Sequence, residues 1–267
     1  LVLGVRLAFY EKSLIYPISN FVGLGNFQEL LMDPTFWMAF KNTITWTVAI
    51  TVVSIVLGLI MALILNQPFR GQGIVRAIWL LPWAIPTIVA SLCWKWIYDP
   101  SIGVLNYILL KLGIIKEPLL YIASSSTALV SVVIVAAWKS YPFTMLALLA
   151  GLQSVPQELY EAGQMDGASA LQRFRYITMP LLMPVIGILT ILQFIWNFNH
   201  FDIVYQLTQG GPGDATMLLS TYVYMLAFGA TRLGYGSAIA VVMLIVLMLF
   251  TVIYLRLHKK QNAEVSL

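Results

Sequence analysis

The chain alternates between long hydrophobic windows and short polar segments. Five windows stand out, at residues 42–69, 77–94, 118–138, 176–201 and 233–255, and the third continues past Lys139 to Gly151. A helix that crosses a bilayer needs about 20 largely apolar residues. The pattern therefore predicts five membrane-spanning helices in an all-α polytopic membrane protein.

Two features qualify this prediction. Residues 215–231 are uncharged but short and rich in Thr, Ser and Tyr, so we expect a helix that lies outside the bilayer or dips into it. Four prolines fall inside the windows and can interrupt helical hydrogen bonding; they are Pro82, Pro86, Pro180 and Pro184. Broken helices flank the substrate path in many transporters, but prolines also occur as tolerated kinks, and the sequence leaves both possibilities open.

Basic residues of the short loops predict the orientation. They are Arg70 and Arg76, Arg173 and Arg175, and Arg256, Lys259 and Lys260. Alternating spans place all three segments on one side, and basic loops mark the cytoplasmic side. We therefore expect an extracytoplasmic segment at 1–36, a transmembrane domain at 37–260 and a cytoplasmic tail at 261–267. We also expect a further span upstream of Leu1, which would return the N-terminus to the cytoplasm.

Composition supports a membrane location. The 267 residues are 60% hydrophobic and 10% charged, whereas soluble domains carry about 25% charged residues. The net charge of +4 includes no basic run of the kind that binds nucleic acid. Cys93, the single cysteine, lies in an apolar run, so there is no disulfide framework.

A polar segment at 153–179 separates the third and fourth windows. Ser154 with Gln157, and Ser169 with Gln172, have the spacing of capping boxes. These signals predict two helix starts. The second helix would pass through the two arginines and enter the membrane.

The first of these helices should cover about residues 156–165. Pro156 suits its first turn, and Gly167 suits a left-handed position after its end. Such a helix would present Glu158, Glu161 and Tyr160 to the cytoplasm. The residues alone leave open whether it is a docking element or an ordinary capped loop.

The same polar segment resembles a known family motif. Glu161-Ala162-Gly163, then Asp166-Gly167-Ala168, then Ile177 and Pro180 resemble the EAA loop of binding-protein-dependent ABC importer permeases. Gly163 stands where the family has a second alanine, and Met179 where it has leucine. The glycine lowers helix propensity by up to ~1 kcal/mol, which would loosen the helix without abolishing docking.

The resemblance extends over nearly the whole chain. Residues 17–43, 195–228 and 234–246 are similar to the external segments and spans of the maltose-type sugar permease subfamily. This implies a type I ABC importer transmembrane domain with a six-helix core, five of whose spans are visible here. It also implies a multi-pass location in a bacterial or archaeal plasma (inner) membrane.

The resemblance further implies partners. They are a second, non-identical permease subunit, two ABC ATPase subunits that bind the EAA loops, an extracytoplasmic solute-binding protein and a carbohydrate substrate. ATP and Mg would be bound by the partner ATPase, so this chain needs no cofactor of its own. Alternating access would follow when ATPase closure pushes on the coupling residues Glu158, Glu161, Ala162, Gly163, Asp166, Gly167 and Ala168.

Catalytic signatures are missing from the sequence. There is no G-x-x-x-x-G-K-[ST] phosphate loop, no H-E-x-x-H pair and no Cys/His cluster, and His200 and His258 are 58 residues apart. We therefore expect a transport subunit without catalytic or metal-binding residues.

Polar residues inside spans default to functional candidates. The candidates for the substrate path are Lys139, Ser140, Gln193, Trp196, Asn197 and Asn199. The W-N-F-N stretch resembles the F-N-F-N stretch where maltose-type permeases contact substrate. Two structural alternatives remain: Lys139 could pair with a backbone carbonyl, and the amides could bond between helices.

Other substrates and functions would require other residues. Lys139 could serve a phosphate, so glycerol phosphate or another polar solute is an alternative substrate. An ATP-independent secondary transporter would need inverted repeats or buried acidic relays, and the spans contain no acidic residue. A membrane enzyme or assembly factor would need a nucleophile–base pair or metal ligands, and the sequence supplies neither.

Overall fold

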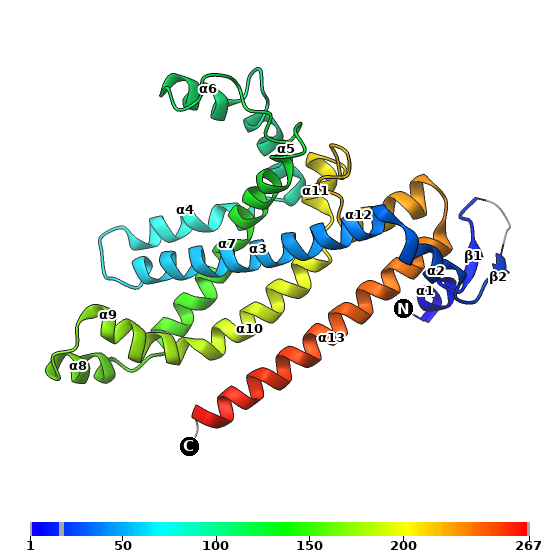
Figure 1. Ribbon diagram of the computed structural model, residues 1–267. Helices are drawn as coiled ribbons and strands as arrows, with labels where there is room; N and C mark the ends of the chain where they lie inside the picture. Colours follow the sequence, from blue (N-terminus) through cyan, green and yellow to red (C-terminus); the bar gives the residue numbers. More distant parts are fainter. Residues whose placement is uncertain (1, 16–18, 266–267) are drawn as a thin grey trace. The chain divides into compact units, whose positions relative to one another are not determined.

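The computed structural model describes residues 2–15 and 19–265, with side chains as far as Arg256. Within these residues the fold is helical apart from one small hairpin (Figure 1). The first helices are α1 (Val2–Leu7), α2 (Gly25–Met32), α3 (Pro34–Leu65), α4 (Gln72–Ala84), α5 (Thr87–Ile97) and α6 (Val104–Lys111). The later ones are α7 (Ala128–Gln153), α8 (Gln157–Met165), α9 (Ala170–Arg173), α10 (Met179–Phe198), α11 (Asp202–Leu207), α12 (Leu219–Tyr224) and α13 (Leu233–Val265).

Four further elements complete the list. The π-helix η1 (Phe174–Thr178) joins α9 to α10, and the π-helix η2 (Met225–Gly229) follows α12. Strands β1 (Tyr10–Lys12) and β2 (Ser19–Phe21) form the antiparallel hairpin. The expected all-α fold is therefore confirmed for the membrane domain, while its N-terminal segment adds a hairpin that the hydrophobic pattern did not predict.

Four stretches are long and apolar enough to cross a membrane: Pro34–Leu65, Ala128–Gln153, Ala170–Phe198 and Leu233–Arg256. A fifth candidate is the pair α4 and α5, whose axes are bent by 94°. The five predicted windows thus have their counterparts. The stretch at 215–231 contains a helical run of only Leu219–Gly229, which agrees with the prediction that it is not a full span.

One window is broken and one window boundary was wrong. The window at 77–94, where the prolines left a helix break possible, contains such a break: α4 ends at Ala84 and α5 begins at Thr87. The intervening Pro86 has no N–H with which to continue the helix. The window at 118–138 began too early, because α7 starts at Ala128.

The chain divides into two compact units, and each is considered by itself. One unit comprises Ala49–Pro86 and Ala136–Phe194. Its core is a fully apolar cluster from α3, α7 and α10: Ala62, Leu65, Met145, Leu148, Leu149, Leu152, Leu182 and Leu189. Gly58 lets α3 approach α7 closely, since an added Cβ would lie 2.9 Å from the backbone nitrogen of Met145. Small residues at helix contacts are typical of membrane bundles.

The other unit comprises Leu1–Val48, Thr87–Val135 and Ile195–Leu267. Here α1, α2 and β1 pack against α13, and α11 packs against α5. Gly234 is required at the contact with β1, because any Cβ there would overlap the carbonyl oxygen of Tyr10. The fully buried Trp46 donates its indole N–H to the carbonyl oxygen of Asn197 at 3.1 Å. This tertiary contact orders the end of α10.

Candidate functional site

The short helix α8 matches the predicted helix at 156–165, but it begins differently. Pro156 occupies the N-cap position, and no side chain caps the helix. The predicted capping box at Ser154 was wrong: its hydroxyl donates to the carbonyl oxygen of Gly151 at 2.8 Å. Gln157 donates instead to Glu161 within the helix, at 2.9 Å. The end of α7 therefore uses the hydroxyl that the pattern had assigned to α8.

The turn after α8 was predicted correctly. Gly167 adopts a left-handed conformation with φ of +77°, and the amide of Ala168 donates to the carbonyl oxygen of Gly163 at 2.8 Å. The second capping box is present, because Ser169 accepts from the amide of Gln172 at 3.3 Å and its own amide donates to the Gln172 side chain at 2.7 Å. A rigid turn therefore leads directly from α8 into the helix that continues to Phe198.

Side chains of α8 contact this following helix. Tyr160 was expected to face the cytoplasm, but it is half-buried, and its hydroxyl lies 3.0 Å from that of Thr178. In the turn between the two helices, Arg173 donates to the carbonyl oxygen of Ala168 at 2.7 Å. Gly163 faces Ile177, where an added Cβ would lie 3.1 Å from its Cδ1 atom. The helix continues through Gly163, and the glycine permits tight packing onto η1.

The other coupling candidates face outward. Glu158, Glu161, Ala162, Asp166 and Gly167 are exposed, whereas Gly163 and Ala168 are half-buried. Met165 is 89% exposed and Leu159 is 42% exposed. Sequence reasoning missed these two apolar side chains; their signal was hydrophobic residues within an otherwise polar segment. Exposed apolar groups beside charges mark protein-contact surfaces.

Lys139 lies on α7 and binds the end of α4. Its Nζ donates to the carbonyl oxygen of Ile85 at 2.6 Å and to that of Pro82 at 3.4 Å. The Pro82 carbonyl would ordinarily accept from residue 86, but Pro86 has no N–H. A cation also suits the negative end of a helix dipole. The structure therefore gives Lys139 a capping role at the helix break, which corresponds to the backbone-carbonyl alternative and weakens the argument for a phosphate substrate.

The remaining candidates for the substrate path differ in how far their side chains are buried. Gln193 is 3% exposed and donates to the hydroxyl of Thr144 at 3.0 Å, an interhelical hydrogen bond. Asn197 is 2% exposed, whereas Trp196 is 51% exposed. Asn199 is exposed and lines a cavity of about 540 Å³. Ser140 is half-buried on α7.

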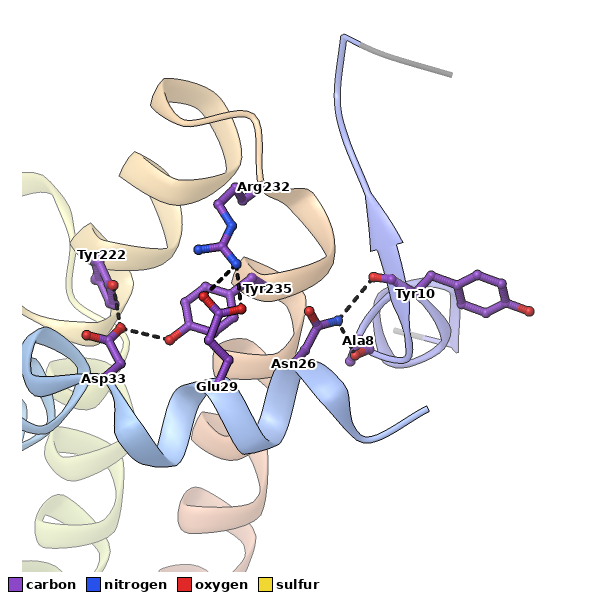
Figure 2. Close-up of polar contacts among 8 residues, drawn as sticks. All are labelled: Ala8, Tyr10, Asn26, Glu29, Asp33, Tyr222, Arg232 and Tyr235. Atoms are coloured by element: carbon purple, nitrogen blue, oxygen red, sulfur yellow. Dashed lines mark hydrogen bonds and ion pairs between the residues drawn. The ribbon is translucent and has the colours of Figure 1, made fainter. Parts of the chain in front are cut away.

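A polar cluster that the sequence did not predict joins the N-terminal segment to α12 and α13. The hydroxyls of Tyr222 and Tyr235 both donate to the carboxylate of Asp33, at 2.6 and 2.7 Å (Figure 2). Arg232 pairs with Glu29 at 2.6 Å. Both members of this ion pair are nearly half exposed, so the pair adds little stability. The Asp33 bonds are the stronger anchor, because hydrogen bonds to a charged group are the more stabilising kind.

Asp33 makes stability depend on pH. Burial raises the pKa of Asp33, but hydrogen bonds from the two tyrosines and from backbone amides outweigh it, so the pKa lies below its ordinary value of 3.8. A depressed pKa contributes stability above the ordinary value, and this contribution is lost as pH falls through the folded-state pKa.

We expect Asp33→Asn to lower the free energy of unfolding at neutral pH by about 1.5 kcal/mol and to flatten the loss of stability below pH 3.8. Unfolding of the detergent-solubilised protein followed against pH would measure both effects. Asp202→Asn, at an exposed carboxyl of α11, is the control. An unchanged pH profile for Asp33→Asn would contradict the assignment.

Among the side chains that the structure describes, no group of three or more His, Cys, Asp or Glu residues could hold a metal ion. The geometry defines a class: a polytopic helical membrane protein with an exposed short helix rigidly joined to a long span. Residues 54–263 match the family of binding-protein-dependent transport system inner membrane components. The chain belongs to this family, and it is therefore a multi-pass inner-membrane transport component.

Curated relatives agree with this assignment. The chain is 42% identical over 256 residues to the trehalose/maltose transport system permease protein MalF of Thermococcus litoralis, covering 95% of this chain and 85% of the relative. It is 37% identical over 259 residues to the sulfoquinovosyl glycerol transport system permease protein SmoG of Agrobacterium fabrum, covering 97% and 83%.

Solved structures show the same fold. A chain from the crystal structure of a bacterial ABC transporter involved in the import of the acidic polysaccharide alginate aligns with a TM-score of 0.81 at 24% identity, covering 96% of this chain and 88% of that one. The fold is therefore that of an ABC importer transmembrane domain.

Proposed function

We propose that this chain is the membrane-spanning permease subunit of an ATP-driven, binding-protein-dependent carbohydrate importer, and that 153–179 is its cytoplasmic coupling loop. The observation that carries the proposal is α8: a helix with no buried residue that is hydrogen-bonded to the start of a long span. A helix so exposed needs a partner. Its acidic and apolar side chains suit a protein surface.

Force would pass from α8 through two contacts. The Tyr160–Thr178 hydrogen bond and the packing of Gly163 on Ile177 both end on η1. Single-turn π-helices occur frequently at functional sites. Closure of the ATPase pair on ATP binding would push α8, displace η1 and tilt α10. ATP hydrolysis would reverse the motion, which gives alternating access.

A carbohydrate is the proposed substrate class. Relatives at 37–42% identity are named for transport of trehalose/maltose and of sulfoquinovosyl glycerol. Amide and aromatic side chains suit a sugar, because amides bond hydroxyls and rings stack on C–H faces. Trp196, Asn197 and Asn199, at and just beyond the end of α10, are the proposed contacts, and Gln193 and Ser140 are weaker candidates.

The arrangement in the membrane follows from the basic loops. We place residues 1–36 outside and the tail at 261–267 in the cytoplasm, with the permease domain at 37–260. The partners would be a second, non-identical permease, two ATPase subunits that bind ATP and Mg, and a solute-binding protein on the outer face.

A mild-detergent pull-down of the tagged native chain tests the assembly. We expect a Walker-motif ATPase and a second permease in stoichiometric amounts. The purified complex in liposomes should then import trehalose, maltose or sulfoquinovosyl glycerol only with ATP and a binding protein. A chain that purifies alone and transports without ATP would overturn the proposal in favour of a secondary transporter.

A further inference from the structure

A second cavity is lined by residues of α11, α12, η2 and the loop at 208–218, and its described lining includes no residue of α10. Its volume is about 510 Å³, within the range of small-molecule sites. The lining includes Tyr205, Gln209, Asp214 and Tyr224. All four belong to one compact unit and lie in the connection between the fourth and fifth predicted spans.

One wall of this cavity belongs to a cluster of four aromatic rings. Tyr205 stacks on Phe201 with ring centroids 4.8 Å apart. Tyr224 meets Tyr205 edge-on at 4.9 Å and contacts Phe228 at 5.1 Å. Tyr224 remains 36% exposed. A partly exposed tyrosine ring that its neighbours hold in place can contact the apolar C–H face of a sugar.

Another part of the lining comes from a strained loop at 208–218. Gln209 and Asp214 adopt positive φ angles of 52° and 61°, a conformation that is uncommon for residues other than glycine. Strain of this kind persists only where the surroundings enforce it, and it concentrates at functional sites. Both strained residues line the cavity.

Hydrogen bonds to its carbonyl oxygens hold the loop in this conformation. Asn42 donates its side-chain amide to the carbonyl oxygens of Asp214, Ala215 and Met217, at 3.1, 3.3 and 3.2 Å. The hydroxyl of Thr216 bonds the carbonyl oxygen of Gly211 at 2.7 Å. The loop is therefore fixed in advance, and preorganisation reduces the entropy that a ligand must lose on binding.

The charges of the lining residues limit the kind of ligand that the cavity can bind. Of the described residues that line the cavity, none is Lys or Arg, and Asp214 is the acidic one. Such a wall disfavours phosphates and acidic sugars and suits neutral hydroxyl groups. We infer that the cavity between Tyr205, Tyr224, Gln209 and Asp214 is a binding subsite for a neutral saccharide unit, separate from the polar residues of α10. The inference rests on the proposed carbohydrate import.

Protection of an introduced thiol tests the subsite. Met225 lines the cavity and is 41% exposed, so Met225→Cys, made in a Cys93→Ser background, places a reactive group there. The purified transporter complex would be alkylated with a maleimide in the presence of maltose, trehalose or glycerol, with modification of this chain followed by mass spectrometry. Ile108→Cys, at a residue 46% exposed on α6, is the matched control.

Maltose or trehalose should slow alkylation at position 225 about tenfold when the site is about nine-tenths occupied, while glycerol and the control position show no effect. Adding Tyr224→Leu should raise the sugar concentration needed for protection about three- to tenfold, and Tyr224→Phe should not. Equal alkylation with and without either disaccharide overturns the subsite, as does protection that survives Tyr224→Leu unchanged. Wild-type uptake is measured separately, so failed import of any sugar identifies failure of the proposed function instead.

Discussion

Replacing Glu161 with lysine is expected to uncouple ATP hydrolysis from transport while leaving membrane insertion intact. Glu161 is exposed on α8 and is held by Gln157 at 2.9 Å, so the substitution changes the surface without disturbing a core. Reversing a charge at a protein interface costs several kcal/mol, and each 1.4 kcal/mol of lost docking free energy is about tenfold in affinity. ATP-driven uptake in proteoliposomes should therefore fall at least about tenfold.

The control for this prediction is Glu117→Lys, a charge reversal at another exposed acid. Glu117 lies in the connection between the second and third predicted spans, which the alternation of spans places on the opposite side of the membrane from α8. Comparison of ATPase activity with uptake in the same vesicles separates uncoupling from loss of protein. Unchanged transport by Glu161→Lys would show that α8 is not the docking element.

Replacing Lys139 with methionine is expected to destabilise the protein by about 1–3 kcal/mol. Methionine retains most of the apolar stem but removes the donor that satisfies the carbonyl oxygens of Ile85 and Pro82. Leaving a buried acceptor without a partner costs about 1–3 kcal/mol, and Pro86 cannot supply the missing donor. The thermal unfolding midpoint in detergent would measure the loss.

Two further variants complete this experiment. Lys139→Arg keeps a donor and should recover most of the stability, while Lys95→Met changes an exposed lysine on α5 and should have little effect. If Lys139→Met unfolds like the wild type but raises the KM for uptake, the lysine contacts substrate and does not cap the broken helix.

The features tested by these variants are divided between the two compact units. The unit at Ala49–Pro86 and Ala136–Phe194 holds α8, the Tyr160–Thr178 contact and the Lys139 cap. The other unit holds the Asp33 cluster and the proposed saccharide subsite. Glu161 and Lys139 variants therefore test coupling and helix continuity, whereas Asp33 and Tyr224 variants test the expected outer segments.

The sequence alone determined the features that depend on local chemistry. Charge-free windows of sufficient length predicted the spans, since a bilayer excludes charge along a stretch of about 20 residues. Gly167 and the Ser169–Gln172 box predicted the turn after α8, because their conformational preferences and hydrogen bonds involve residues within one or two turns.

Only the tertiary structure decided which long-range partners the polar groups find. A lone lysine in a span has several possible roles, and the position of the Pro86 break relative to α7 selects one of them. The Ser154 hydroxyl could accept from the amide of Gln157 or donate to a carbonyl oxygen at the end of α7, and in the structure it donates to Gly151. The docking of the N-terminal segment depends on Gly234 and on tyrosines about 200 residues from Asp33. Contacts over such separations arise from packing of the whole unit, and local sequence patterns carry no signal for them.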